Sequence, residues 1–166
     1  MRPLSKLLLL CGVAIAYGAC SAGAIAAESP AAPLRIVFVC EHGSVKSLVA
    51  MEYFNREVRE RGLAYRAIAR GTAPEPEVPS VVRDGLHTGG FNVSAFKPQK
   101  FAASDLDHAS LVVSFDQDVA KIVAGRAHYL KWDDLPDVLT NYARGRDAII
   151  GHLNELIGEL ARINAP

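Results

Sequence analysis

One cysteine and one lysine stand at a spacing that suits chemistry on an oxyanion. Cys40 is followed by five residues and then by Lys46 and Ser47, and the intervening segment contains Gly43. A short loop of this kind can turn successive backbone N–H groups toward one point, and a helix N-terminus behind it adds positive potential. A thiol inside such a loop is favoured as the nucleophilic thiolate, because donors that would hold a phosphate also stabilise its charge. The alternative is an inert cysteine that ends a core strand.

The segments on either side of this loop have the patterns of a buried strand and an amphipathic helix. Residues 34–39 are a nearly continuous apolar run, which is typical of a strand buried on both faces of a parallel sheet. From Ser47, apolar residues recur at helical spacing as far as Val58, and Gly62 ends the pattern. The loop therefore follows the carboxyl end of a strand, which is where open α/β sheets bind their ligands.

The rest of the chain alternates between strand-like and helix-like segments. Further strands are expected at residues 65–69, 111–115 and 127–132. Further helices are expected at residues 80–86 with Ser80 as the cap, around 119–123, and at 141–163. The last helix should bury one face, formed by Ile149, Leu153, Leu156, Leu160 and Ile163. This alternation predicts an α/β fold, a small three-layer open parallel sheet of about four strands with helices on both faces.

The first 27 residues have the composition of a secretory signal peptide. Arg2 and Lys6 precede an uncharged apolar stretch, and small residues lead to a cleavage site after Ala26 or Ala27. Two other interpretations stay open. The apolar stretch is long enough to be an uncleaved N-terminal membrane anchor, and Cys20 follows small residues that suit lipid attachment.

The remaining composition predicts one small domain without a strong charge. The chain has 18 basic and 18 acidic residues, and cleavage of the signal would remove two of the basic ones. Near-neutrality argues against a protein that binds nucleic acid or a membrane surface, since such proteins normally carry a basic excess. We therefore expect a signal peptide at 1–27, a linker at 28–33 and one domain at 34–166. The mature protein is expected to be periplasmic or otherwise extracytoplasmic, monomeric and without a membrane span.

The cysteines and histidines give no indication of a metal or a cofactor. No cysteine follows Cys40, so the domain lacks the Cys-x-x-Cys of thioredoxin chemistry and the ligands of a cysteine-based zinc site. Four of the histidines are scattered without metal-like spacing, and we interpret them as ordinary surface or packing residues: His87, His108, His128 and His152. No metal and no cofactor is therefore expected.

Three segments together resemble a known family of enzymes. They are "VFVCEHGSVKSLVAMEYFN" at 37–55, "GGFNVSAFKPQKFAASDLDHASLVVSFDQD" at 89–118 and "WDDLPDVL" at 132–139. In this order they are similar to the low-molecular-weight protein tyrosine phosphatases and the related thioredoxin-coupled arsenate reductases, whose loop is Cys-x5-Arg-Ser/Thr. The resemblance covers residues 34–163. It implies a phosphotyrosine protein phosphatase I-like domain that hydrolyses phosphomonoesters, with a phosphorylated protein, a small phosphomonoester or an oxyanion as its partner.

The resemblance implies a role for each matching position. Cys40 would attack phosphorus and form a cysteinyl-phosphate, Ser47 would hydrogen-bond the sulfur, and Asp137 would be the general acid. Lys46 takes the place of the arginine that holds the phosphoryl oxygens. The phosphate-binding amides would come from Glu41, His42, Gly43, Ser44, Val45 and Lys46.

The sequence also departs from the family pattern. Arginine grips two oxygens with a planar fork, whereas Lys46 offers a point charge, and losing one preorganised donor costs on the order of 10²–10³ in rate. Gly43 replaces the usual asparagine, and Val138 replaces the proline that follows the acid. Asp133 and Asp134 are rival acids in the same segment.

Two functions therefore stay open. The first is an exported phosphatase slowed by Lys46, and the second is a module that binds phosphate or another oxyanion without turnover. Glu41 would place a negative charge at the mouth of the anion site. His42 beside it is unexpected in the family pattern, and it is either a group that stabilises the thiolate or recruits an acidic substrate, or an exposed loop histidine without a special role. An arsenate reductase is disfavoured, because the thioredoxin-coupled enzymes need two further cysteines and none follows Cys40.

We expect export to remove the signal peptide, so that the mature protein begins at Ala27 or Glu28. N-terminal sequencing of the protein recovered from the extracytoplasmic fraction measures this directly. Retention of Met1 in a soluble cytosolic form would contradict the prediction, and a lipid on Cys20 would favour the second interpretation.

Overall fold

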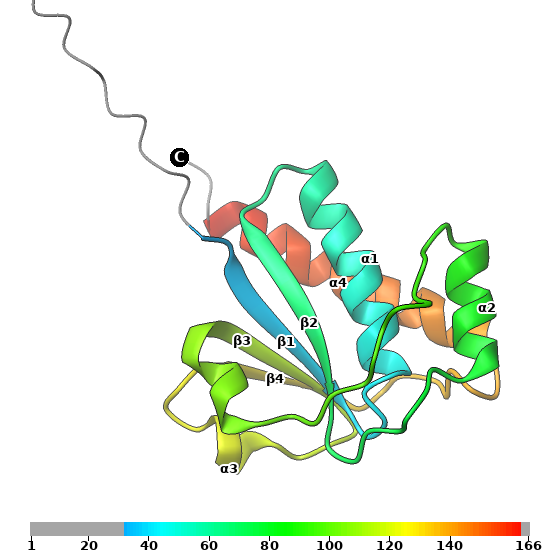
Figure 1. Ribbon diagram of the computed structural model, residues 1–166. Helices are drawn as coiled ribbons and strands as arrows, with labels where there is room; N and C mark the ends of the chain where they lie inside the picture. The colour runs from blue at the N-terminus through cyan, green and yellow to red at the C-terminus, as the bar shows by residue number, and fades with distance from the viewer. Residues whose placement is uncertain (1–31, 164–166) are drawn as a thin grey trace, which may run out of the picture. The chain divides into compact units, whose positions relative to one another are not determined.

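The computed structural model describes residues 32–163, which fold around one parallel sheet (Figure 1). The expected signal peptide at 1–27 and most of the expected linker at 28–33 lie outside these residues, so both stay predictions. Within residues 32–163, every helix is too short or too polar to cross a lipid bilayer.

The four strands of the sheet are all parallel, in the order β2–β1–β3–β4. Their bounds are β1 Leu34–Cys40, β2 Tyr65–Gly71, β3 Ala109–Phe115 and β4 His128–Trp132. From β1 the chain first adds β2 on one side and then crosses back to add β3 on the other side. The carboxyl ends of β1 and β3 therefore flank the point at which the strand order reverses, and such a point forms a crevice for ligands.

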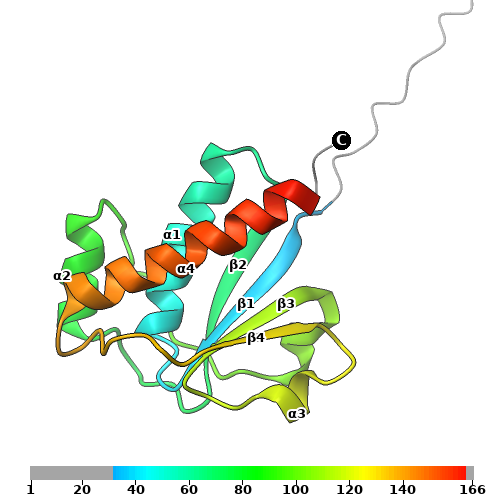
Figure 2. The same ribbon diagram turned by 180° about the vertical axis from the view of Figure 1, so that it is seen from behind.

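Helices cover both faces of this sheet, as Figures 1 and 2 show from opposite sides. The helices α1 Lys46–Glu60 and α4 Tyr142–Ile163 pack together on one face, and α2 Ser80–Thr88 lies against α4. The other face carries the short helix α3 Ala120–Val123 and a 3₁₀ turn, η1 Ala103–His108. The predicted α/β architecture of a four-stranded parallel sheet between helices is confirmed.

The sheet has a hydrophobic core on each face because its central strand is apolar on both sides. Phe38 points toward α1 and α4 and packs in one core with Phe54 and Ile149. Val37, its neighbour in β1, points the other way and packs in a second core with Val123. All five of these side chains are at most 1% exposed. The unbroken apolar run in β1 follows from this burial on both faces.

Two expectations about the helices were wrong in detail. Ser80 does not cap α2, because the preceding Pro79 has the extended backbone of a cap residue and Ser80 is already helical. Ile163 does not belong to the buried face of α4, since it is 76% exposed at the end of the helix, beyond the core. Ile157 is buried instead, and Leu160 is partly buried against the core.

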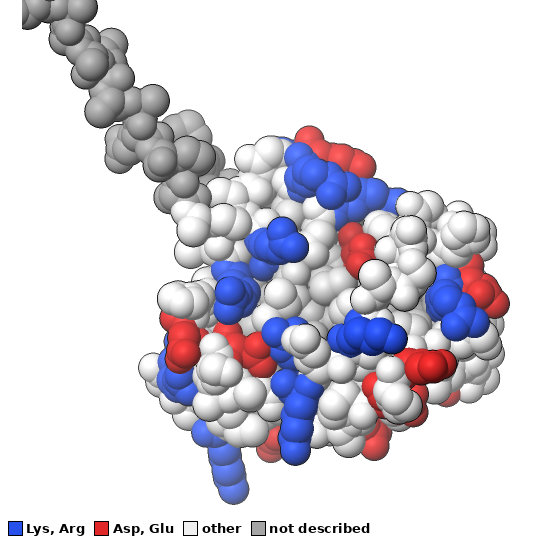
Figure 3. All heavy atoms as spheres, viewed as in Figure 1, with Lys and Arg blue, Asp and Glu red and all other residues white. Residues whose placement is uncertain are grey.

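Charged side chains are spread over the surface without a dominant sign. On the face seen in Figure 3, groups of Lys and Arg alternate with uncharged surface and with Asp and Glu. This distribution agrees with the balanced count of 18 basic and 18 acidic residues in the whole chain.

The glycines of α4 predict opposite effects of the same substitution. A Cβ at Gly145 would lie 2.6 Å from a methyl carbon of Val138, whereas one at Gly158 would meet nothing within 4 Å. We expect Gly158→Ala to raise the free energy of unfolding by about 0.5–1 kcal/mol, because alanine is the better helix former. Gly145→Ala should lower it by about 1–2 kcal/mol through overpacking against Val138. Urea denaturation measures both, and equal shifts would contradict a packing role for Gly145.

Candidate active site

The loop that joins β1 to α1 surrounds the sulfur of Cys40 with hydrogen-bond donors. Cys40 ends β1 and is 4% exposed. Its Sγ accepts a hydrogen bond from the Gly43 amide at 3.2 Å and lies 3.1 Å from the hydroxyl oxygen of Ser47. Ser47 belongs to the first turn of α1 and is fully buried. The structure thus places the predicted nucleophile and the predicted sulfur partner in contact.

The direction of the loop amides is set by a neighbouring segment. The carbonyl oxygens of Cys40, Glu41 and His42 accept hydrogen bonds from N–H groups of the segment 72–75 at 3.0, 2.9 and 3.3 Å. In a trans peptide the carbonyl and the following N–H point in opposite directions. The amides of Glu41, His42 and Gly43 therefore point away from the segment 72–75, and the Gly43 amide reaches the sulfur. An inward set of N–H groups of this kind is an anion-binding nest.

Two glycines allow the loop to lie against the end of β2. Gly43 has φ of +70°, in the left-handed region that other residues rarely adopt. A Cβ at Gly43 would come within 2.8 Å of the Gly71 nitrogen, and a Cβ at Gly71 would come within 2.7 Å of the Gly43 nitrogen. At Gly43 both the left-handed backbone and the nearby backbone of Gly71 disfavour a side chain.

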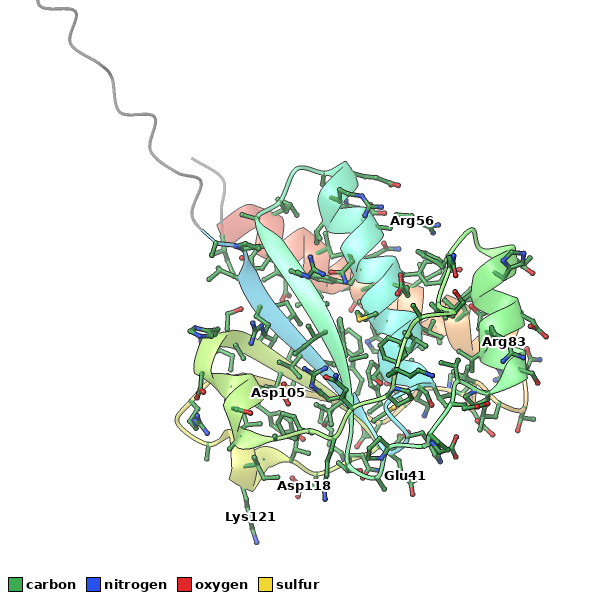
Figure 4. All side chains as sticks on the ribbon, in the orientation of Figure 1. Glu41, Arg56, Arg83, Asp105, Asp118 and Lys121 are labelled. Carbon is green, nitrogen blue, oxygen red and sulfur yellow. The ribbon has the colours of Figure 1, made fainter. Side chains whose placement is uncertain are left out.

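A pocket of about 280 Å³ opens above the sulfur, at the carboxyl ends of β1 and β3. Its lining brings together three segments of the chain: Cys40 and Lys46 from the loop, Asp116 and Gln117 after β3, and Asp137 and Leu139 before α4. Glu41, His42 and Val45 of the predicted amide loop also line it. Figure 4 places Glu41 and Asp118 at this end of the sheet. The predicted residues Cys40, Lys46 and Asp137 therefore share one pocket.

Two residues of the predicted amide loop have other surroundings. Ser44 is fully buried, and its hydroxyl makes no hydrogen bond with any of the residues 32–163. The Nε2 of His42 lies 3.5 Å from a carboxylate oxygen of Glu75, in the segment that supports the loop. His42, which had no role in the family pattern, thus helps to join the loop to residues 72–75.

The ammonium of Lys46 is held by two acceptors from other parts of the fold. Lys46 Nζ donates a hydrogen bond to Asp116 Oδ2 and a longer one, 3.5 Å, to the carbonyl of Leu135. An ammonium group has three N–H donors, so one is left for a ligand in the pocket. The Lys46 side chain is only 14% exposed, and its charge is therefore already balanced in part by a carboxylate before any anion binds.

Sequence reasoning missed Asp116. It has φ of +59°, the one positive value at a residue other than glycine among residues 32–163, in a region that aspartate tolerates better than most residues. The turn that follows is fixed through Gln117, which accepts hydrogen bonds from the Thr72 hydroxyl at 3.1 Å and the Tyr129 hydroxyl at 3.3 Å. The sequence could have identified Asp116 as a site residue only by its position, because it is the first polar residue after the buried strand beside β1.

Of the three candidate acids in the segment 132–139, Asp137 lines the pocket, and the other two have partners elsewhere. Asp133 pairs with Lys131 at 2.9 Å, and Asp134 lies 3.1 Å from Nε2 of His152. Asp137 is exposed, and both of its carboxylate oxygens accept hydrogen bonds from the residues that follow it. The hydrogen bond from the Thr140 hydroxyl is the largest cause that holds the pKa of Asp137 below its usual range. The Leu139 amide and the charge of Lys46 lower the pKa further.

The position of Asp116 predicts how the pocket responds to its removal. We expect Asp116→Asn to tighten the binding of inorganic phosphate or vanadate by about tenfold, because one negative charge leaves the pocket and the ammonium of Lys46 no longer faces a competing carboxylate. Asparagine tolerates the left-handed backbone, so the turn should persist. Titration calorimetry at neutral pH measures the affinity.

Asp118→Asn is the matched control, since Asp118 lies two residues away and its carboxylate accepts the Ala120 amide. It should leave the affinity unchanged. Weaker binding by Asp116→Asn would mean that Asp116 acts mainly by holding Lys46 in place.

Comparisons with known proteins agree with this geometry. A search of curated protein sequences found no significant match. Among solved structures, the low molecular weight protein tyrosine phosphatase of T. tengcongensis superposes with a TM-score of 0.66 and 19% identity, over 76% of this chain and 99% of that one. A low molecular weight phosphotyrosine phosphatase of Vibrio cholerae O395 gives 0.68 and 12%, over 80% and 99%.

A thioredoxin-dependent arsenate reductase of Corynebacterium glutamicum superposes with a TM-score of 0.69 and 18% identity. The match covers 82% of this chain and 66% of the reductase, so the chain spans just under two thirds of that relative. At these identities the structural likeness establishes the fold alone. The sequence evidence is more specific, since the family model described as "Low molecular weight phosphotyrosine protein phosphatase" matches residues 35–145. The chain therefore belongs to the low molecular weight phosphotyrosine protein phosphatase family.

Proposed function

We propose that this protein hydrolyses a phosphomonoester, phosphotyrosine or another aryl phosphate, through a cysteinyl-phosphate on Cys40. The observation that carries the proposal is the environment of the sulfur, which has the Gly43 amide at 3.2 Å and the Ser47 hydroxyl at 3.1 Å. Groups at these distances can hydrogen-bond the sulfur while it attacks phosphorus and when it departs. Membership in the phosphatase family supports the same chemistry.

In the first step, the thiolate of Cys40 attacks phosphorus as the bond to the leaving oxygen breaks. The inward amides of residues 41–43 and the remaining N–H of Lys46 would hold the phosphoryl oxygens, and Asp137 would give the leaving oxygen a proton. In the second step, Asp137 takes a proton from water as the water attacks phosphorus. The sulfur then departs as a thiolate, which Ser47 stabilises.

The cellular location of the protein is a separate proposal, independent of the proposed reaction. We infer an extracytoplasmic, and in a bacterium periplasmic, protein from the composition of residues 1–27 alone.

A second candidate function is the binding of an oxyanion without turnover. It is favoured by the hydrogen bond between Lys46 and Asp116, because a cation that is already balanced gives less stabilisation to a transition state. The thioredoxin-coupled reduction of arsenate is disfavoured, since no cysteine follows Cys40 to resolve the intermediate.

Lys46→Arg separates these two functions. In a working phosphatase we expect it to raise kcat for an aryl phosphate by about tenfold or more, because the planar fork can hold Asp116 and the phosphoryl oxygens together. Single-turnover hydrolysis, with trapping of phosphate on Cys40, measures the chemical step.

Cys40→Ser should abolish turnover in both backgrounds, and Asp137→Asn should slow the release of poor leaving groups most. If neither wild type nor Lys46→Arg turns over any phosphomonoester while wild type still binds vanadate, the protein is a binding module.

A further inference from the structure

Gln117 lines the pocket above Cys40, and one end of its side-chain amide is already held by the protein. Its Oε1 accepts a hydrogen bond from the hydroxyl of Thr72, the residue that follows β2, at 3.1 Å. Its backbone carbonyl accepts the hydroxyl of Tyr129, in β4, at 3.3 Å. The main chain and the side chain of Gln117 are therefore fixed from both edges of the sheet before any ligand binds.

The other end of the amide has no protein partner. Nε2 carries two N–H donors, and it makes no hydrogen bond with any of the residues 32–163. Gln117 is only half-buried, and Thr72, which holds Oε1, is not one of the residues that line the pocket. Because the two ends of a planar amide point in different directions, Nε2 is the end that is left to face the pocket.

The pocket has few donors for a phosphoryl group at the place where Gln117 lies. Lys46 gives two of its three N–H donors to Asp116 and to the carbonyl of Leu135, so one donor remains. An arginine at this position could give two parallel N–H donors to the phosphoryl oxygens. Gln117 directly follows Asp116, so its amide comes from the same turn that holds the ammonium of Lys46.

We propose that Nε2 of Gln117 donates a hydrogen bond to a phosphoryl oxygen and so supplies the donor that Lys46 lacks in comparison with arginine. Gln117 and Lys46 then present together the two donors of one guanidinium group. Thr72 is a positioning residue, because its hydroxyl decides which end of the amide faces the pocket. This inference rests on the proposed function, since it assigns a further contact to the phosphoryl group at the same site.

Thr72 also connects this donor to the amide loop. Its backbone N–H donates to the carbonyl of Cys40 at 3.0 Å, and its side-chain hydroxyl donates to Gln117. One residue thus helps to set the direction of the loop amides and the orientation of the Gln117 amide. Donors that are fixed in this way stabilise a transition state without a cost of reorganisation when the reaction takes place.

The test is a double-mutant cycle between Gln117 and Lys46. Gln117→Met keeps an unbranched side chain of similar length and removes both donors, and Lys46→Arg restores the planar fork. The bond from Tyr129 to the backbone carbonyl of Gln117 does not need the side chain, so the turn should persist. Titration calorimetry measures the affinities of the four proteins for inorganic phosphate and vanadate, and single-turnover hydrolysis of phenyl phosphate measures the chemical step.

We expect Gln117→Met to weaken the binding of vanadate about tenfold and to lower the single-turnover rate by a similar factor. With Lys46→Arg in place, the same substitution should weaken binding by less than about threefold, because the fork already supplies the second donor. The affinity for phosphate should fall less than that for vanadate, since vanadate on a thiolate has the flattened geometry of the transferring phosphoryl group.

Thr72→Val and Thr72→Ser test the orientation of the amide separately. Thr72→Val removes the hydroxyl and keeps the backbone N–H that holds the Cys40 loop, so it should weaken vanadate binding about threefold. Thr72→Ser keeps the hydroxyl and should behave like wild type. When Gln117→Met is already present, Thr72→Val should have no further effect, whereas a purely structural role of Thr72 would still lower the affinity.

Equal losses from Gln117→Met with and without Lys46→Arg would overturn the inference, because Gln117 would not then replace a donor of the arginine. Tighter binding by Gln117→Met would also overturn it, since the amide oxygen would then face the anion. If Gln117→Met fails to fold, equal vanadate affinities of wild type and Thr72→Val overturn the inference.

The proposed phosphatase function and this inference can fail separately. Absence of turnover with every phosphomonoester would overturn the phosphatase proposal alone, because the vanadate affinities would still decide whether Gln117 binds the anion. A wild-type protein that binds neither phosphate nor vanadate would overturn both.

Discussion

Three backbone carbonyls at the start of the Cys40 loop accept hydrogen bonds from the segment 72–75, and the chemistry of the site depends on them. Because these carbonyls are held on the outer side, the amides that follow them face the sulfur and the pocket. The close approach requires Gly43 in the loop and Gly71 at the end of β2, where Gly71 is the strand partner of Cys40. The loop that carries the nucleophile is thus positioned by the end of β2 and the segment 72–75, and neither contributes a residue to the pocket lining.

The pocket beside this loop has more acidic than basic residues in its lining, which is unusual for a site that binds phosphate. The pocket lining includes Glu41, Asp116 and Asp137, and Lys46 is the lysine among the lining residues. Asp116 and the Leu135 carbonyl occupy two of the three N–H groups of that lysine. An arginine has five N–H donors in a planar fork and would have enough to serve both the protein and a phosphoryl group. The consequence of lysine at this position is therefore a competition between Asp116 and the ligand.

The segment that carries the proposed acid is attached to the rest of the molecule at several points. Val138 is fully buried and lies where any side chain at Gly145 of α4 would be, so the helix and the segment pack closely. Asp134 lies 3.1 Å from His152, whose ring stacks on Trp132 with ring centroids 4.8 Å apart. These contacts replace the rigidity that a proline after Asp137 would supply, and they explain how an exposed carboxylate keeps a defined place at the pocket.

The sequence by itself determined which backbone elements meet at the site. The apolar run of β1, the helical periodicity of α1 and the spacing from Cys40 to Ser47 are local patterns, and they predicted the loop. The contact of Ser47 with the sulfur was expected from the family resemblance of this segment. Only the tertiary structure decided the partners of the charged groups. Lys46 and Asp116 are 70 residues apart, and several carboxylates follow strands or lie near the acid, so periodicity cannot select among them. Their pairing depends on the parallel register of β1 and β3 and on the left-handed turn at Asp116, both of which arise when the sheet packs between its helices.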